Sequence, residues 1–310
     1  HQVLMDMVNQ EVDYALAHGV NYFDTAPAYG DSEEITGKAL SRHPRKSYYL
    51  ATKLSDVRGE PTFEKSVESY KRSLKRLQTD YIDYYLLHCI GTPNADRFRA
   101  RFVDNGVLDY LVEERKKGHI RQLGFSFHGD FSTFQWCVDN NDKYKFDFVQ
   151  IQMNYVDWRH ASGGNTNAEQ LYALAEQCGW NVIIMEPLQG GRLVNVPKHI
   201  DTRMKEKFGD DVKPAELAFR WCGTYPKVLT SLSGMTYLNI LEENVATHTP
   251  LKPMNEEELA FMEDTARLML DKRAVACNNC SYCMPCHFKV NIPGVFKYYN
   301  DQLVAGNIIR

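Results

Sequence analysis

The sequence of 310 residues lacks a long apolar run, since no stretch approaches the ~20 residues that a membrane-spanning helix needs. Its beginning also lacks the charged segment and apolar core that are typical of a secretory signal. Basic residues are not in excess, because the formal net charge is −4 and the sequence pI about 6.2. We therefore expect no general attraction to nucleic acid or to an anionic membrane, and a cytoplasmic protein.

Apolar runs alternate with amphipathic segments from the beginning of the chain to about residue 250. Seven of these runs predict strands, at residues 20–26, 47–53, 82–88, 120–126, 146–152, 181–187 and 227–233. The runs are rich in Val, Ile, Tyr, Phe and Leu without clean alternation, which is typical of parallel strands covered on both faces. The clearest helix is predicted at residues 62–78, where Phe63, Val67, Tyr70, Leu74 and Leu77 recur every three or four positions.

Repeated strand–helix units favour a parallel sheet, either an open doubly wound sheet or a closed (β/α)8 barrel. No Gly-x-Gly-x-x-Gly motif follows the first strand, which disfavours an open dinucleotide-binding sheet. A helix predicted at residues 5–19 precedes that strand, so one more strand upstream of the helix would close a barrel. We therefore predict an α/β protein with a (β/α)8 TIM barrel at residues 1–250, whose first strand is missing from the given chain.

Residues 251–310 have a different character. A helix is predicted at residues 255–272 with Asn255 as its N-cap, and four cysteines follow in CNNCSYCMPC. The tail is too short for an apolar core, so this small, mostly helical, cysteine-rich appendage would need a metal to stabilise it. The remaining cysteines stand singly in apolar contexts that are typical of buried, reduced thiols; they are Cys89, Cys137, Cys178 and Cys222.

Four polar residues stand at the ends of three consecutive predicted strands: Asp24, Tyr29, Lys53 and His88. Catalytic groups of barrels gather at the C-terminal ends of the strands. A Tyr can donate a proton to a carbonyl oxygen, a neighbouring ammonium group favours the phenolate, and a buried ammonium group requires a carboxylate. A His can hydrogen-bond the same substrate oxygen. Singly, the four could be a helix cap, a packed ring, a solvated lysine and a core histidine, but together they predict an active site.

The segments DTAPAYG (24–30), ATKLS (51–55) and LLHCI (86–90) resemble the aldo/keto reductase family in order and spacing. Members of this family are (β/α)8 barrels that transfer hydride from NADPH to a carbonyl through an Asp–Tyr–Lys–His tetrad. The resemblance extends from about residue 5 to residue 250. It implies a small-molecule carbonyl substrate and a tetrad of Asp24, Tyr29, Lys53 and His88, with Tyr29 as the general acid.

The resemblance also implies bound NADP, or NAD. The implied cofactor-binding residues are Ser126, Gln150, Met185, Pro187, Leu188, Gly190, Ser233, Gly234, Met235, Glu243 and Asn244. Ser126 and Gln150 correspond to contacts with the carboxamide, and Met185 stands where many members have the ring-stacking aromatic residue. Residues 233–244 contain no Arg or Lys, which usually bind a 2′-phosphate, so we expect weak discrimination between NADPH and NADH.

Cys277, Cys280, Cys283 and Cys286 have the spacing C-x2-C-x2-C-x2-C, which suits a [4Fe–4S] cluster. Structural zinc on the same four thiolates is the alternative. The motif resembles the beginning of the ferredoxin-like domain carried by one branch of the aldo/keto reductases, which implies an iron–sulfur electron-transfer module and a redox partner protein. In that branch a second cysteine motif follows, and none follows here before Arg310.

Two other functions compete with carbonyl reduction. A Schiff-base aldolase would use Lys53 as an uncharged nucleophile in apolar surroundings. A redox-sensing subunit would bind nicotinamide without useful turnover. Three departures from the family pattern favour that subunit: Phe127 follows Ser126 where Asn is usual, Met185 replaces an aromatic residue, and Arg is missing from residues 233–244.

Overall fold

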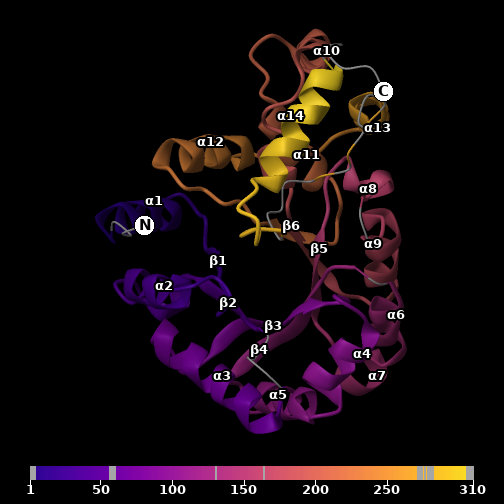
Figure 1. Ribbon diagram of the computed structural model, residues 1–310. Coiled ribbons are helices and arrows are strands. Elements are labelled where there is room, and N and C mark those ends of the chain that lie inside the picture. Colours follow the sequence, from indigo (N-terminus) through magenta and orange to yellow (C-terminus); the bar gives the residue numbers. More distant parts are fainter. Residues whose placement is uncertain are drawn as a thin grey trace. The chain divides into compact units, whose positions relative to one another are not determined.

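The computed structural model describes residues 5–55, 61–129, 131–162, 165–270, 275, 277 and 283–304. Within these residues, seven strands lie in chain order in one sheet, with helices between them (Figure 1). The strands are β1 (Tyr22–Asp24), β2 (Tyr49–Leu54), β3 (Ile82–Ile90), β4 (Ile120–Phe127), β5 (Phe148–Gln152), β6 (Asn181–Met185) and β7 (Val228–Ser231). Each overlaps a predicted strand, and the pairs from β1 to β5 are parallel, so the predicted α/β fold with a parallel sheet is confirmed.

The chain splits into two compact units. The first takes in His1–Ile151, Leu171–Ile183 and Gly234–Ala246, and the second Gln152–Gln170, Ile184–Ser233 and Thr247–Arg310. Strands β1 to β4 lie in the first unit, where Lys53 of β2 lies beside Leu86 of β3 and Ser126 of β4 beside Gln150 of β5. The domain boundary near residue 250 stays a prediction.

Helices follow the strands along the chain. Those of the described residues are α1 (Met5–Ala17), α2 (Ser32–Leu40), α3 (Phe63–Leu77), α4 (Ala95–Phe98), α5 (Val107–Lys116), α6 (Phe131–Asp139), α7 (Asn141–Tyr144), α8 (Asp157–His160), α9 (Ala168–Gln177), α10 (Lys198–Phe208), α11 (Pro214–Cys222), α12 (Leu238–His248), α13 (Glu256–Leu270) and α14 (Ile292–Val304). Short helical turns are η1 (Arg45–Ser47), η2 (Arg99–Val103) and η3 (Gln189–Gly191). None of the described helices combines the length and apolar character needed to cross a membrane.

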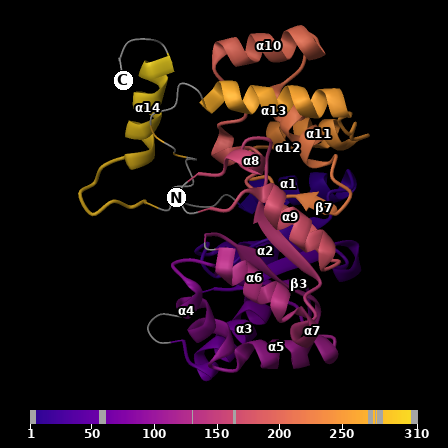
Figure 2. The ribbon, with the colours of Figure 1, turned by 90° about the vertical axis from the view of Figure 1, so that its right-hand side faces the viewer.

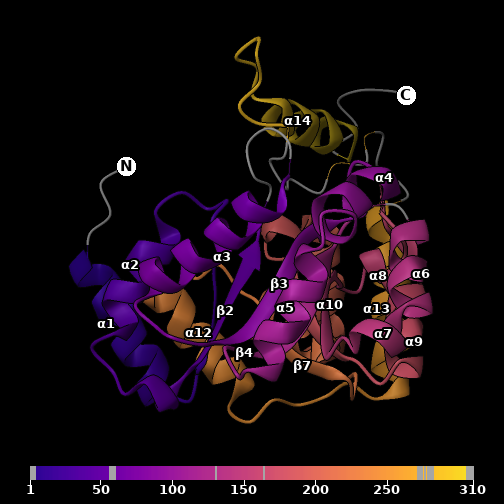
Figure 3. The same ribbon diagram turned by 90° about the horizontal axis from the view of Figure 1, so that it is seen from below.

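Helices α3 and α5 lie along strands β2 to β4 in the first unit (Figure 3). Helix α3 confirms the helix predicted at residues 62–78, and the Thr62 side chain caps it by accepting a hydrogen bond from the Lys65 backbone. The buried stripe differs from the predicted one, because Phe63 is exposed. The buried positions of this helix are Ser66, Ser69, Tyr70, Ser73 and Leu77. Small serine side chains thus form much of the surface that the helix buries.

Aromatic rings pack around the middle of β4. The ring of Phe125 meets those of Phe134, Phe146 and Trp180 edge to face, with centroid separations of 5.7, 5.1 and 5.4 Å. The Trp180 indole is buried and donates a 3.0 Å hydrogen bond to the Asn141 side chain. This cluster of rings packs against β4 directly before Ser126.

In the second unit, helices α10, α11 and α13 pack side by side (Figure 2). The Phe208 and Phe261 rings meet edge to face, and Arg220 forms a 2.7 Å ion pair with Glu258. The Asn255 side chain accepts from the Glu258 backbone at 2.9 Å, and the Glu258 carboxylate accepts from the Asn255 backbone at 2.9 Å. This reciprocal capping box confirms the predicted N-cap of α13.

Candidate active site

The ends of β1 and β2 hold a buried ion pair. Lys53 is fully buried, and its ammonium group donates a short hydrogen bond to Asp24 Oδ1 and a 2.9 Å hydrogen bond to the Thr25 carbonyl oxygen. The pairing of Asp24 with Ala51 sets the register that brings the two side chains together. The charge of Lys53 is therefore shielded from solvent and balanced by the Asp24 carboxylate.

The Asp24 carboxyl is poorly solvated. Its side chain is 11% exposed, and Oδ2 has no hydrogen-bond partner among the described residues. Burial raises the pKa of Asp24 above its ordinary value, and the ammonium group of Lys53 offsets part of that rise. The buried hydroxyl of Tyr22, two residues earlier on β1, likewise finds no partner there, and burial with the Asp24 charge raises its pKa.

Tyr29 lies over this pair with half of its side chain exposed. The Lys53 ammonium nitrogen is 5.1 Å from the centroid of the Tyr29 ring. The ring also meets the His88 imidazole edge to face, with 5.8 Å between centroids and 90° between planes. The side chains of Asp24, Tyr29, Lys53 and His88 thus converge at three neighbouring strand ends of the first unit, where solvent reaches the phenol.

His88 is half-buried, and its imidazole is neutral. Its Nδ1 is 2.7 Å from the hydroxyl oxygen of Ser55. Burial, followed by the positive charges of Lys53 and Arg101 and by His128, lowers the pKa of His88 to about 3. The ring is therefore uncharged near neutrality and can carry only one ring proton.

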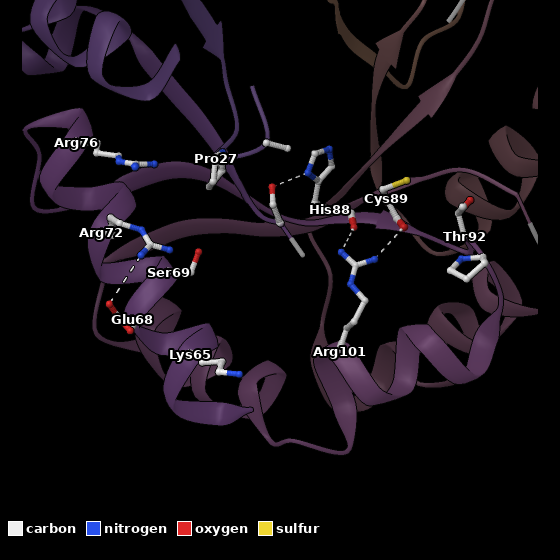
Figure 4. Close-up of a pocket in the computed structure, with 13 residues that line it drawn as sticks. Pro27, Lys65, Glu68, Ser69, Arg72, Arg76, His88, Cys89, Thr92 and Arg101 are labelled. Atoms are coloured by element: carbon white, nitrogen blue, oxygen red, sulfur yellow. Dashed lines mark hydrogen bonds and ion pairs between the residues drawn. The ribbon is translucent and has the colours of Figure 1, made fainter. Parts of the chain in front are cut away.

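The backbone at His88 is held from two sides. Cys89 adopts a left-handed φ of 54°, and the register of β3 against β4 shifts between Leu87 and Ile90. The Arg101 guanidinium, from η2, donates to the His88 carbonyl oxygen at 2.8 Å and to the Cys89 carbonyl oxygen at 3.4 Å (Figure 4). These contacts fix the position from which the imidazole projects.

A cavity of about 760 Å³ opens beside His88, which among the four candidate residues is the one that lines it (Figure 4). Its lining residues are Pro27, Ala28, Ser55, Lys65, Glu68, Ser69, Arg72, Thr92, Pro93, Arg76, His88, Cys89 and Arg101. The volume suits a small molecule or part of a larger one. Strand-end groups and one face of α3 form its walls. The half-buried Cys89 belongs to this lining, although the sequence predicts a buried, reduced thiol.

Ser126 and Gln150 lie beside each other on β4 and β5, and both are buried. The Ser126 oxygen accepts a 2.8 Å hydrogen bond from the Cys89 backbone, so its own proton can be donated elsewhere. The side-chain oxygen of Gln150 is buried and has no partner among the described residues. A carboxamide has a carbonyl oxygen, which accepts a hydrogen bond, and an NH2 group, which donates one. The Ser126 hydroxyl could donate to the first and the Gln150 oxygen could accept from the second.

The other predicted cofactor residues divide between the units. Met185, Pro187, Leu188, Gly190 and Ser233 belong to the second unit, and Gly234, Met235, Glu243 and Asn244 to the first. Gly190 and Gly191 have φ values of 63° and 88°, which only glycine adopts easily. Met185 is half-buried, Gly234 and Glu243 are exposed, and Asn244 is half-buried.

The sequence did not single out Glu186, which directly follows β6. Its φ is 52°, and its Oε2 is buried without a partner in the described part of the chain. Burial and the charge of Asp157 raise the pKa of Glu186 to about 7. Its pKa thus lies well above the ordinary range of a glutamate.

The predicted metal ligands are described only in part. Cys277 and Cys286 are half-buried, Cys283 is exposed, and all three thiols are free of disulfides. Cys280 lies outside the described residues. No group of three or more metal-ligating side chains occurs among the residues that the structure describes. The four-thiolate site stays a prediction.

Comparison with known proteins adds a family to this geometry. Residues 2–264 match the sequence model of the aldo/keto reductase family. The chain is 26% identical to an aldo-keto reductase of Mycolicibacterium paratuberculosis over 261 residues, which cover 83% of this chain and 82% of that protein. It is 36% identical to D-arabinose 1-dehydrogenase of Saccharomyces cerevisiae over 140 residues, or 41% of this chain and 39% of that protein.

Solved structures agree in fold. An aldo-keto reductase of Klebsiella pneumoniae in complex with NADPH aligns with a TM-score of 0.66 at 23% identity, covering 87% of each chain. The holo form of the aldo-keto reductase AKR11C1 of Bacillus halodurans aligns with a TM-score of 0.67 at 24% identity, covering 85% of this chain and 88% of that one. At these identities the likeness establishes the fold.

Proposed function

The chain belongs to the aldo/keto reductase family, and on that premise we propose that Asp24, Tyr29, Lys53 and His88 form the tetrad that reduces a small-molecule aldehyde or ketone to an alcohol. The protein is an NAD(P)H-dependent oxidoreductase, which its family and its relatives named as dehydrogenases support. The proposal therefore concerns the residues that carry the reaction.

One observation supports this assignment above all: the ammonium nitrogen of the fully buried Lys53 lies 5.1 Å from the ring centroid of the half-exposed Tyr29. A cation so close stabilises the phenolate left after Tyr29 has donated its proton to the carbonyl oxygen. Asp24 holds the Lys53 ammonium group in place through their ion pair. The neutral His88 imidazole can donate a hydrogen bond to the same substrate oxygen, which orients the carbonyl and stabilises its developing charge.

NADP is the proposed cofactor, supported by the NADP and NADPH complexes of the Klebsiella pneumoniae neighbours. When bound, it supplies the hydride. Ser126 would donate a hydrogen bond to the carboxamide oxygen, and Gln150 would accept one from the carboxamide nitrogen. The buried, unpartnered oxygen of Gln150 supports this pairing. Gly190 would allow close approach of the backbone to the pyrophosphate. The remaining proposed contacts are Met185, Pro187, Leu188, Ser233, Gly234, Met235, Glu243 and Asn244.

We also propose that residues 1–250 form a (β/α)8 barrel domain. For residues 251–310 we propose an appendage in which Cys277, Cys280, Cys283 and Cys286 hold a [4Fe–4S] cluster, with zinc as the alternative. The spacing of the cysteines supports this, and a redox partner protein would then exchange electrons with the cluster. An anaerobic visible spectrum distinguishes the two metals, because only the cluster absorbs there.

The tetrad is tested by Tyr29→Phe, which removes the proton donor and keeps the ring. NADPH-dependent reduction of a panel of aldehydes and ketones should be abolished, while NADPH binding by calorimetry stays unchanged. Tyr49→Phe is the matched control, since Tyr49 is 46% exposed on β2, close to the 50% of Tyr29. Equal rates for Tyr29→Phe and the unchanged protein would refute the role of Tyr29. Tight NADPH binding without turnover of any carbonyl would favour the redox-sensing subunit.

A further inference from the structure

The imidazole of His88 has a fixed neighbour that the tetrad does not include. The hydroxyl oxygen of Ser55 lies 2.7 Å from His88 Nδ1, which is a full hydrogen bond (Figure 4). Ser55 is 8% exposed, so water does not replace this contact readily. A serine hydroxyl can donate or accept, and a neutral imidazole has one nitrogen of each kind. The contact therefore couples the hydroxyl proton to the choice of imidazole tautomer.

We propose that Ser55 is a positioning residue: its hydroxyl donates to Nδ1 of His88 and so places the single ring proton on Nε2, which then donates to the substrate carbonyl oxygen. This inference rests on the proposed function for the substrate contact, but the tautomer itself does not depend on it. The hydrogen bond made by one ring nitrogen sets the protonation of the other. With the opposite tautomer, Nε2 would present a lone pair to the carbonyl oxygen and repel it.

The strand geometry explains why a serine occupies this position. Lys53 lies on β2, and Ser55 directly follows the last residue of that strand, so one short segment carries both side chains. Lys53 binds Asp24 of the strand on one side, and Ser55 binds His88 of the strand on the other. The segment ATKLS thus contacts two neighbours of the Tyr29 ring: Lys53 pairs with Asp24, and Ser55 hydrogen-bonds His88.

Charge around the ring limits the imidazole to a single proton. Lys53 and Arg101 are the cations that act on His88, and His128 adds to their effect. Both cations disfavour a second proton on the ring, so the imidazole cannot satisfy Ser55 and the substrate by becoming an imidazolium. The ring therefore carries one proton, and the hydrogen bond from Ser55 determines which nitrogen holds it.

The direct test is nitrogen NMR of the full chain labelled with 15N-histidine, with the His88 signals assigned through a His88→Gln variant. The expected spectrum at neutral pH shows a protonated Nε2 and an unprotonated Nδ1. Ser55→Ala should shift both nitrogens toward intermediate values, because the two tautomers then interconvert, whereas Ser55→Thr should restore the original pattern. A protonated Nδ1 in the unchanged protein, or an unaltered pattern in Ser55→Ala, would overturn the proposal.

Steady-state kinetics give the second readout. We expect Ser55→Ala to lower kcat about tenfold, the effect of one neutral hydrogen bond, without changing NADPH affinity, and Ser55→Thr to recover the rate. Ser73→Ala is the control, since it removes another buried serine hydroxyl of the first unit, which donates to the Ser69 carbonyl oxygen. An unchanged kcat in Ser55→Ala would overturn the role of Ser55. Failure of Tyr29→Phe to impair turnover would instead refute the tetrad and leave the NMR result standing.

Discussion

Replacing Lys53 by Met removes one half of a buried ion pair and keeps most of the side-chain volume. Lys53 is fully buried, the Asp24 side chain is 11% exposed, and Asp24 Oδ2 has no partner among the described residues. The variant would leave a carboxylate without a counter-ion in poorly hydrated surroundings. Removing one partner of a buried pair typically costs about 3–5 kcal/mol, and we expect a loss of this size in the free energy of unfolding at pH 7.

This loss should depend on pH with a definite sign. Burial already raises the pKa of Asp24, and without Lys53 nothing offsets that rise. A carboxyl whose folded pKa lies above its unfolded value of about 3.9 destabilises the fold at high pH and ceases to do so as the pH falls toward that value. The stability difference between Lys53→Met and the unchanged protein should therefore shrink as the pH is lowered from 7 to about 4.

Urea denaturation followed at both ends of this pH range measures the effect. Lys38→Met serves as the control, because Lys38 is exposed on α2 and its replacement should change stability by no more than about 0.5 kcal/mol. The double variant Asp24→Asn, Lys53→Met removes both charges and should recover most of the loss. A cost below about 1 kcal/mol for Lys53→Met, or one that is the same at pH 4 and pH 7, would refute the buried ion pair.

Three further outcomes are expected in the first unit. Burial and nearby charge lower the pKa of His88 to about 3 in the folded protein, against about 6.5 in the unfolded chain. The free energy of unfolding should therefore fall by up to ~1.4 kcal/mol per pH unit as the pH drops between these two values. His88→Gln should remove this pH dependence from the stability measured by urea unfolding. Gly124→Ala should cost about 1–3 kcal/mol in thermal unfolding, because its Cβ would lie 2.3 Å from the Phe148 carbonyl oxygen. Arg101→Leu should cost about 1.5–3 kcal/mol in urea unfolding, since it removes the charged hydrogen bonds to the carbonyl groups of His88 and Cys89; an unchanged midpoint would refute that contribution.

The strands could be predicted because their signal is local. Dense apolar runs between turn residues mark parallel strands, and the C-terminal ends of such strands meet at one edge of a sheet. That rule alone placed Asp24, Lys53 and His88 close together, and the structure does bring them together. The electrostatics also followed from residue type, since a buried ammonium group requires a nearby carboxylate.

The parts that could not be predicted depend on contacts that have no local signature. Arg101 reaches the His88 carbonyl from a helical turn thirteen residues later, and nothing in its immediate sequence marks that bond. Ser55 lies within the motif ATKLS, but only the pairing of β2 with β3 shows that it meets His88. The apolar periodicity of α3 placed Phe63 on the buried face, whereas the helix buries the smaller Ser66, Ser69 and Ser73.

The state of Lys53 bears on the choice between reduction and aldol chemistry. A Schiff-base lysine attacks a carbonyl through a neutral amine, which apolar surroundings favour by lowering the stability of the ammonium form. Here the nitrogen donates hydrogen bonds to a carboxylate oxygen and to the Thr25 carbonyl oxygen, and a nucleophilic amine would have to give up both contacts. Before it could attack a carbonyl, the ammonium group would have to lose a proton and the buried ion pair with Asp24 would have to break. Borohydride in the presence of a carbonyl panel should therefore leave Lys53 unmodified, and peptide mass mapping that found substrate trapped on Lys53 would favour the aldolase.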